Sequence, residues 1–337
     1  MLDPLVSVII VNWNGCHHLD VCISSLLAQT HQNYEIFLID NGSKDGSVEH
    51  TKKHYPSVRI TSLPENLGFC EANNIGIKQA NGEYIALINN DTEADQYWLS
   101  ESIGALESHP EAGFIASRIR LFFQRKYIDT TGDILFRTGY PGKRGWLLLD
   151  GPEYEKNKWV FGACAGASVY RRSMLNEIGL FDPDFFSFME DIEISFRAHL
   201  YGYRCLYVAS AIVYHKVGST ANLESPQRQF WSHRNHWYNL IKNLPALLWA
   251  KYFFQILGAE LFVFGSAIKN QRTNVFFNAR IEVLKNLSKM LQKRKRIQKE
   301  RKVPIQYINS MLQSGWFSLR IKEKKQDFVS LSNSEKL

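Results

Sequence analysis

The sequence predicts an α/β fold, built on a mostly parallel sheet that helices flank. Over residues 5–119, short apolar runs alternate with amphipathic stretches, as in repeated βα units. Polar loops follow the apolar runs, at the edge where such sheets bind ligands. After about residue 225 the strand signals largely stop and the chain looks helical. We therefore expect a sheet-based domain followed by a helical C-terminal annex.

The first 119 residues are expected to hold five strands and four helices. Runs of apolar residues predict the strands, and leucine, isoleucine or alanine at helical spacing predicts the helices. The expected strands cover residues 6–11, 35–39, 58–62, 84–88 and 114–117. The expected helices cover residues 17–28, 47–55, 72–80 and 97–108.

The middle of the chain interrupts this alternation. Residues 120–160 contain Thr130-Thr131-Gly132-Asp133 and further glycine- and proline-rich turns, which predict an excursion of hairpins and loops. The pattern resumes through residues 161–168. Helices are then expected near residues 173–178 and over 191–201, with a strand near 205–208.

Three helices are expected in the annex, over residues 227–243, 245 to about 268, and 274 to about 302. The second is the most apolar segment of the chain, but Lys251, Gln255 and Glu260 lie well inside it. A charged residue near the centre of a membrane span costs about 2.5 to 3.5 kcal/mol. A helix that lies in the membrane interface fits better. The alternative is a helical pair packed on the main domain, with a solvated basic face.

Length and composition agree with this organisation. A chain of 337 residues is longer than most single cores, so we expect one domain over residues 1–225 and a separate region over 226–337. A hydrophobic content of 45% is ample for a packed core. Five scattered cysteines without a CxxC pair fit a reducing compartment, and the N-terminal apolar run does not resemble a signal peptide. We therefore expect a cytoplasmic protein.

The net charge of +7 is concentrated near the C-terminal end. Nine lysine and arginine residues fall between Lys285 and Lys302. Such a block seeks an anionic partner. The apolar segment upstream favours an anionic membrane surface over nucleic acid.

Polar residues follow four of the expected strands, and in a parallel sheet these strand ends meet at one edge. Each segment alone is ordinary turn chemistry, but together they favour a nucleotide site. No GxGxxG follows the first strand and no GxxxxGK[ST] is present, which argues against a dinucleotide cofactor and a P-loop. The four segments are Asn12-Trp13-Asn14-Gly15, Asp40-Asn41-Gly42-Ser43, Glu65-Asn66-Leu67-Gly68 and Asn89-Asn90-Asp91.

Glu190-Asp191 forms a second acidic signature, after the aromatic run of residues 185–188. Carboxylates at the start of a helix interact favourably with its N-terminus, so a capping role is one interpretation. A general base that takes a proton from a reacting hydroxyl is the other.

Together these motifs resemble family-two glycosyltransferases with the GT-A fold, in the branch that includes rhamnosyltransferases. The resemblance covers roughly residues 5–243, with its motifs in the expected order. Besides the segments above, it rests on Asn73-Asn74-Ile75-Gly76, Gly179-Leu180-Phe181-Asp182, Phe186 to Asp191, and Tyr214-His215.

The resemblance implies a nucleotide-sugar site in the half of the domain over residues 1–119. Asp40 would receive the N3 hydrogen of a uracil or thymine base, and Asn90 would contact the ribose. Asp91 would hold Mg²⁺ or Mn²⁺ against the diphosphate, and His215 would complete the metal site. The expected nucleotide-binding residues are Asn12, Asn14, Asp40, Asn66, Gly68 and Asn90.

The resemblance also implies a catalytic site in the acceptor half, over about residues 120–225. Asp191 would be the general base, and Glu190 would position it or an acceptor hydroxyl. Arg234 and Asn235 could face the diphosphate or the acceptor. Many relatives place further carboxylates where this chain has asparagine before Asp91, so the metal should bind weakly until the diphosphate supplies oxygen ligands.

The function implied is inverting, metal-dependent transfer of a sugar onto a glycan or lipid-linked glycan, in surface polysaccharide synthesis at the inner face of the plasma membrane. dTDP-rhamnose is the expected donor, and UDP-galactose, UDP-glucose and UDP-N-acetylglucosamine are alternatives. Two other classes stay open: a nucleotidyltransferase, and a non-catalytic protein that binds glycans or membranes.

Overall fold

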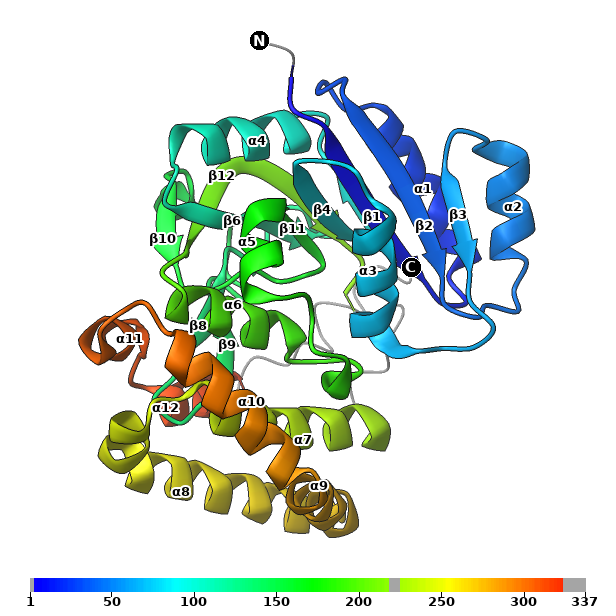
Figure 1. Ribbon diagram of the computed structural model, residues 1–337. Coiled ribbons are helices and arrows are strands. Elements are labelled where there is room, and N and C mark those ends of the chain that lie inside the picture. The colour runs from blue at the N-terminus through cyan, green and yellow to red at the C-terminus, as the bar shows by residue number, and fades with distance from the viewer. Residues whose placement is uncertain (1–2, 218–224, 324–337) are drawn as a thin grey trace.

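The computed structural model describes residues 3–217 and 225–323, and it confirms the α/β fold (Figure 1). Its main sheet is mixed, and the strands follow the order β10-β12-β6-β11-β4-β1-β2-β3, with β5 paired to β12 and β7 paired to β6. The C-terminal helices gather at one end of the molecule, below the sheet in Figure 1. The predicted sheet with a helical annex is therefore present.

Four parallel strands form the N-terminal half of the sheet: β1 (Val6–Asn12), β2 (Tyr34–Asp40), β3 (Arg59–Ser62) and β4 (Tyr84–Asn89). Their register aligns the polar ends, because Asn12 pairs with Asp40 on one side and Val11 pairs with Asn89 on the other. The strand ends predicted to meet at one edge do so.

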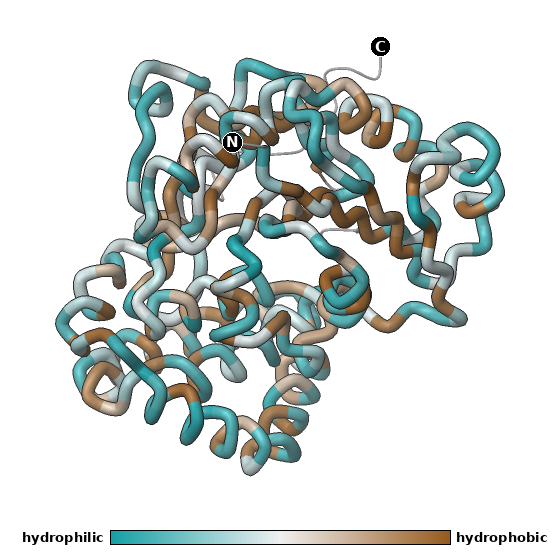
Figure 2. Tube along the Cα trace, turned by 45° about the horizontal axis from the view of Figure 1, so that its top comes forward, coloured by the Kyte–Doolittle hydropathy of each residue, from teal (hydrophilic) through white to brown (hydrophobic). Residues whose placement is uncertain are grey.

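Helices cover both faces of this sheet. Successive residues of β1 point to opposite faces, so Ile9 joins one apolar core and Ile10 the other. Figure 2 shows the hydrophobic stretches along the central strands. The helices of this half are α1 (Cys16–Leu27), α2 (Ser47–His54), α3 (Gly68–Gln79) and α4 (Trp98–Ser108).

The second half of the sheet is mainly antiparallel. Its strands are β5 (Thr92–Ala94), β6 (Ala112–Leu121), β7 (Ile128–Thr130), β10 (Lys158–Val160), β11 (Ala167–Arg171) and β12 (Arg204–His215). The predicted excursion also contains a separate two-stranded hairpin of β8 (Asp133–Leu135) and β9 (Pro141–Lys143), in which Asp133 pairs with Lys143. Short 3-10 turns lie at η1 (Pro152–Tyr154) and η2 (Pro183–Phe185).

Eight helices complete the described part of the chain. They are α5 (Arg172–Ile178), α6 (Glu190–Leu200), α7 (Pro226–Asn243), α8 (Ala246–Lys269), α9 (Thr273–Lys285), α10 (Leu287–Glu300), α11 (Ile305–Met311) and α12 (Trp316–Glu323). The single helix expected from residue 274 to about 302 is wrong, because α9 ends before Asn286. The Asn286 side chain donates to the Glu282 carbonyl oxygen at 3.0 Å, the local bonding that favours a helix boundary.

The basic block packs partly against the protein. Lys289 and Lys293 on α10 pair with Asp184, and Lys293 also pairs with Asp182, at 2.5 to 2.7 Å. Arg294 donates to two carbonyl oxygens at the end of α7, at 2.7 Å each. Several cations of the block therefore hold α10 against the rest of the molecule, while Lys285, Lys295, Arg296 and Lys299 are exposed.

Helix α8 is the one helix of the described residues that is long and apolar enough to cross a membrane, judged by length and composition alone. One such helix is weak evidence for a membrane span. Its buried residues pack into the molecule, among them Leu248, Tyr252 and Ile256.

Candidate active site

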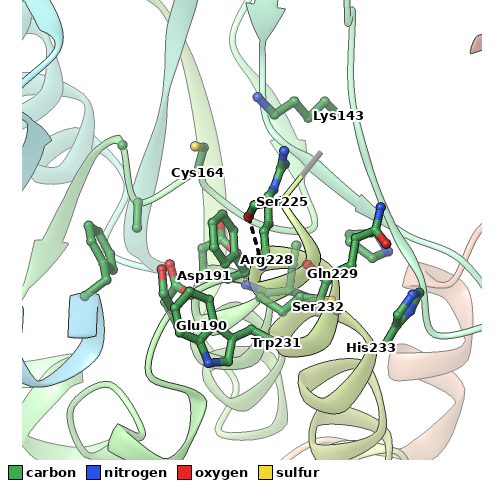
Figure 3. A pocket seen from close by; sticks show the side chains of 18 of the residues that line it. Lys143, Cys164, Glu190, Asp191, Ser225, Arg228, Gln229, Trp231, Ser232 and His233 are labelled. Carbon is green, nitrogen blue, oxygen red and sulfur yellow. Dashed lines mark hydrogen bonds between the residues drawn. The ribbon is translucent and has the colours of Figure 1, made fainter. Parts of the chain in front are cut away.

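A pocket of about 1270 Å³ opens at the strand ends. Its wall combines residues of both halves of the sheet with residues of α7, α8 and α12. Figure 3 shows one part of it, where Glu190 and Asp191 lie side by side below Cys164 and near Arg228. The two predicted acidic signatures share this pocket, because Asp91 also lines it.

The predicted nucleotide residues form a hydrogen-bonded group at the ends of β1, β2 and β4. The Asn12 amide donates to Asp40 Oδ1 at 3.1 Å and accepts from the Asn90 amide at 2.7 Å. Asp40 Oδ2 accepts from the Ser43 backbone N–H at 3.0 Å. All three predicted residues are buried, so their network sets the shape of the loops around the pocket.

Asn14, Asn66 and Gly68 belong to the adjoining loops. Asn14 has φ of 50° and accepts from the Lys44 backbone N–H at 2.8 Å. Asn66 accepts from the Asn41 side chain at 2.9 Å, and both of these residues line the pocket with Gly68. Trp13, which sequence reasoning did not assign a role, is 46% exposed and lines the same wall.

Asp91 and His215 come together because β5 pairs with β12. In that pairing His215 lies opposite Thr92, and the Lys216 backbone N–H donates to the Asp91 carbonyl oxygen at 2.9 Å. His215 Nε2 lies 3.4 Å from Asp91 Oδ1. Burial would lower the pKa of His215, but its bond to Asp129 and its contact with Asp91 raise that pKa to about 9.

Asp129 is a part of the site that the sequence did not reveal. Its fully buried carboxylate accepts from His215 Nδ1 at 2.8 Å and from Lys143 Nζ at 2.5 Å. Burial would raise the pKa of Asp129, yet Lys143 and His215 lower it to about 2. Because Asp129 occupies Nδ1, the other ring nitrogen of His215 faces Asp91, the orientation that metal-binding histidines have in proteins.

These residues suit a divalent cation held jointly with a ligand. Asp91 supplies an oxygen and His215 a nitrogen, a donor set that Mg²⁺ or Mn²⁺ accepts. No group of three or more His, Cys, Asp and Glu side chains among residues 3–217 and 225–323 is arranged to hold a metal alone. Further ligands would have to come from phosphate oxygens and water.

Asp133 and Lys143 bring two further titratable side chains to the pocket from the hairpin β8–β9. Both line it, as do Glu190 and Asp191. Burial and the charge of Asp191 raise the pKa of Asp133 well above its usual range. Burial would lower the pKa of Lys143, but Asp129 raises it to about 12, so this lysine stays charged.

Glu190 and Asp191 open α6 and differ in their surroundings. Burial and the neighbouring Asp191 raise the pKa of Glu190 well above its usual range. Burial also raises the pKa of Asp191, but its bond from the Ile192 backbone N–H, at 2.8 Å, and the charge of Lys143 oppose that rise. Asp191 is therefore the carboxyl of this pair that ionises more readily.

An unusual backbone leads into this pair. Phe186, Phe188 and Met189 have φ between 62° and 69°, a region that side chains other than glycine rarely adopt. Gly68 approaches so closely that a Cβ there would lie 2.6 Å from Phe186. The Cys70 backbone N–H also donates to the Phe186 carbonyl oxygen, at 3.1 Å. The loop before Asp191 is thus in direct contact with the start of α3.

Arg234 and Asn235, predicted to face the diphosphate or the acceptor, bond to the backbone of this loop. The fully buried Asn235 amide donates to the carbonyl oxygens of Phe185, Ser187 and Phe188 at 2.7 to 3.0 Å. Arg234 Nη2 donates to the carbonyl oxygens of Asp184 and Phe185 at 2.9 Å. Both side chains are committed to the backbone that positions Glu190 and Asp191.

The site therefore combines a polar strand edge, a carboxylate beside a histidine, and a half-buried carboxylate able to take a proton. Comparison with known protein families identifies the family in which this combination of features occurs. Residues 7–179, just over half of the chain, match the family model described as glycosyl transferase family 2. This chain belongs to that family.

Curated relatives of this glycosyltransferase take part in making bacterial glycans. It is 28% identical over 243 residues to the O-antigen biosynthesis protein RfbC of Myxococcus xanthus, covering 68% of this chain but 18% of that protein. It is 25% identical over 283 residues to the N-acetylglucosaminyl-diphospho-decaprenol L-rhamnosyltransferase of Mycobacterium tuberculosis, covering 74% of this chain and 87% of the relative. The chain thus spans less than a fifth of one relative and most of the other.

Solved structures share the fold of this glycosyltransferase. GalNAc-T7 with UDP, GalNAc and Mn²⁺ aligns over 85% of this chain and 57% of its own, with a TM-score of 0.61 and 17% identity. The mannosyltransferase PcManGT of Pyrobaculum calidifontis, in complex with GDP-Man and Mn²⁺, aligns over 88% and 86%, with a TM-score of 0.53 and 13% identity. The predicted GT-A fold is confirmed.

Proposed function

We propose that this glycosyltransferase transfers a sugar from a nucleoside diphosphate donor by a single, inverting displacement that depends on a divalent metal. One observation carries the proposal: Asp191 shares a pocket with Asp91, which lies beside His215. A displacement at a sugar carbon needs a base for the attacking hydroxyl and positive charge for the departing diphosphate. Asp191 could serve as the base, and Asp91 with His215 could hold the cation that supplies the positive charge.

The proposed donor is dTDP-rhamnose, with UDP-galactose, UDP-glucose and UDP-N-acetylglucosamine as alternatives. The mycobacterial relative described as a rhamnosyltransferase supports rhamnose, because the similarity extends over most of both chains. Asp40, Asn12, Asn90, Asn14, Asn66 and Gly68 would form the nucleotide end of the site.

Asp91 and His215 would hold Mg²⁺ or Mn²⁺ together with the diphosphate. When bound, the cation supplies a Lewis acid that neutralises charge on the leaving group. The buried Asp129 fixes the ring of His215 through Nδ1, and Lys143 keeps Asp129 ionised. The two structural neighbours described with Mn²⁺ support a divalent ion.

Asp191 would accept the proton of the attacking acceptor hydroxyl. Its raised pKa strengthens it as a base, while Lys143 keeps it ionisable. Glu190, whose pKa is raised by burial and by Asp191, would orient Asp191 or the acceptor hydroxyl. Asn235 and Arg234 would be positioning residues, because they hold the loop that ends at Asp191.

The acceptor would be a glycan or a lipid-linked glycan of a surface polysaccharide, met at the cytoplasmic face of the plasma membrane. The O-antigen and decaprenol-linked activities in the names of the relatives support this placement. Residues 1–225 would form the catalytic domain, with a nucleotide half up to about 119, and residues 226–337 the helical region.

The test is a screen of the purified chain against dTDP-rhamnose and the UDP-sugars, each with Mn²⁺, Mg²⁺ or EDTA. We expect one donor to bind and to release nucleoside diphosphate slowly, and EDTA to abolish both. Release of pyrophosphate instead would identify a nucleotidyltransferase. Binding to none of the donors would favour the non-catalytic alternative.

The Asp191→Asn variant tests the base. With an acceptor present, transfer should fall at least about 100-fold while donor binding stays intact. Asp20→Asn is the matched control, because the Asp20 side chain lies on α1 and is 61% exposed. Undiminished transfer by the Asp191 variant would exclude it as the base.

A further inference from the structure

Helix α8 carries an exposed apolar stripe along its whole length. Leu247, Phe254, Leu257, Leu261 and Ile268 are between 42% and 81% exposed. Their spacings of seven, three, four and seven residues place them on one side of a helix. Over 21 residues the stripe is about 32 Å long.

Helix α9 extends this surface. Phe277, Ile281 and Leu284 are also exposed, at 49% to 68%, and are spaced by four and three residues. Contacts of the Phe264 ring with the rings of Phe276 and Phe277, at 5.1 and 5.6 Å, join the two helices. We call the eight exposed side chains of α8 and α9 the apolar face.

The opposite side of α8 is already packed in the protein. Leu248, Tyr252, Ile256 and Ala259 are 3% exposed or less. Glu260 pairs with Arg280 of α9 and accepts from the Trp237 indole of α7. Because one side of α8 packs against the protein, α8 cannot be surrounded by lipid on all sides. Its exposed side can only lie along the surface of a membrane or of another molecule.

The exposed charges beside the apolar face are mainly positive. Lys251, Lys269 and Lys285 are exposed, whereas the acidic Glu260 is turned inward to Arg280. Glu282, the other acidic residue of these two helices, is partly buried and accepts from the Asn286 side chain. An apolar stripe with a lysine rim is the composition that binds an anionic bilayer surface.

Helix α8 also forms part of the pocket wall. Phe262, Val263, Ser266 and Ala267 line the pocket, together with Arg272 just beyond the helix. These four residues of α8 lie between Leu261 and Ile268 of the apolar face. A surface that binds the apolar face and a substrate in the pocket would therefore both contact α8.

We propose that the apolar face docks onto an anionic lipid bilayer, with α8 lying in the plane of the membrane interface and the α8 side of the pocket next to the headgroups. This inference rests on the proposed function, because docking would bring the pocket to a lipid-linked acceptor. The glycan of that acceptor would reach Asp191 while its lipid stays in the membrane. The apolar face holds the protein there, and the lysine rim selects anionic headgroups.

The test is co-sedimentation of the full chain with vesicles of phosphatidylcholine plus phosphatidylglycerol, compared with phosphatidylcholine alone. We expect stronger binding to the anionic vesicles. The double variant Phe254→Ser, Leu261→Ser should bind them at least about tenfold more weakly, because it removes two large apolar side chains from the interface. The matched control is Leu27→Ser, Tyr97→Ser, which changes two side chains 43% and 50% exposed on the α1 and α4 side of the sheet.

Two further measurements on the same proteins separate the alternatives. If the apolar face instead binds a second copy of the chain, the Phe254, Leu261 variant will have a lower molecular mass than the unmodified protein in analytical ultracentrifugation. It will also bind vesicles as strongly as the unmodified protein does. This result would overturn the proposal. Failure of the unmodified chain to bind anionic vesicles would also overturn it. Donor hydrolysis should be unchanged in the variant. Vesicle binding without hydrolysis of any donor would support docking and refute the proposed function.

Discussion

The carboxyl group of Asp191 lies in the pocket beside Glu190, in surroundings that favour its neutral form. Burial raises its pKa above the ordinary 3.8. A base works only when deprotonated, so the rate should fall as the pH drops through this raised value. We expect the acidic limb of the pH–rate profile above the range of an exposed aspartate, measured as nucleoside diphosphate release with saturating donor.

A substitution of Lys143 should shift the acidic limb of the pH–rate profile. Its positive charge lowers the pKa of Asp191, so the Lys143→Gln variant should shift the acidic limb toward higher pH. Loss of the charge also leaves Asp129 without its lysine partner, so the variant should unfold at a lower Tm. The control is Lys158→Gln, an exposed lysine on β10. An unchanged limb would show that Lys143 does not act on the base.

At the scale of residues, the sequence predicted the groups that follow strongly patterned strands. Asp91, Glu190 and Asp191 line one pocket, and His215 lies beside Asp91. Asp129, Asp133 and Lys143 could not be assigned, because residues 120–160 carry no periodic pattern. Only the pairing of β8 with β9 brings Asp133 opposite Lys143. The sequence singles out Arg234 and Asn235 as a motif, but their bonds to the loop backbone depend on the packing of α7.

At the scale of elements, α7 positions the loop that ends at Asp191. Asn235→Ala removes three bonds to the loop carbonyls, so the loop should relax from its unusual backbone. Displacement of a reacting group by about 1 Å can cost 100-fold in rate. We expect kcat to fall between about 10- and 100-fold, with the donor KM little changed.

Asn239→Ala is the matched control for this variant. Asn239 is equally buried one turn along α7, but its side chain accepts from Asn243 rather than contacting the loop. It should lower Tm without a comparable loss of kcat. Equal losses of kcat in both variants would indicate general destabilisation and contradict the positioning role.

The contact of α6 with α7 contains a buried charge network. Burial would raise the pKa of Glu193, but Arg197 and Lys242 outweigh it and lower the pKa to about 2. The carboxylate therefore stabilises the fold above its ordinary pKa of 4.5, and this stability is lost as the pH falls toward about 2. The Tm should decrease over that interval. Glu193→Gln should make the decrease shallower and lower the Tm at neutral pH, as followed by circular dichroism.

Most elements could be predicted where one pattern persists over a full helix or strand. Strands β1, β2 and β4 were expected within one residue of their observed bounds. Strand β5 has three residues and follows Asp91, where sequence alone indicates a turn. Strand β12 runs on to His215, but a register shift between Val208 and Ile212 interrupts its alternation. Short or irregular strands of this kind are fixed by pairing with neighbouring strands, so a local sequence pattern does not predict them.

At the scale of the whole molecule, Asp182 joins the sheet domain to the C-terminal helices. It pairs with Lys242 of α7 and Lys293 of α10. Breaking a buried ion pair costs about 3 to 5 kcal/mol, so the two parts should unfold together. We expect one transition in urea, with tryptophan fluorescence and circular dichroism superimposed. Two separated transitions would show that residues 1–225 are stable alone.

The absent side chain of Gly68 has a consequence for engineering. The loop of residues 65–69, which we propose to contact the nucleotide, touches the loop before Asp191 where even a methyl group would collide with Phe186. Attempts to change donor preference by exchanging residues 65–69 for those of another family member will therefore disturb turnover as well. A working chimera needs both loops from the same parent, and directed evolution of one loop should accumulate compensating changes in the other.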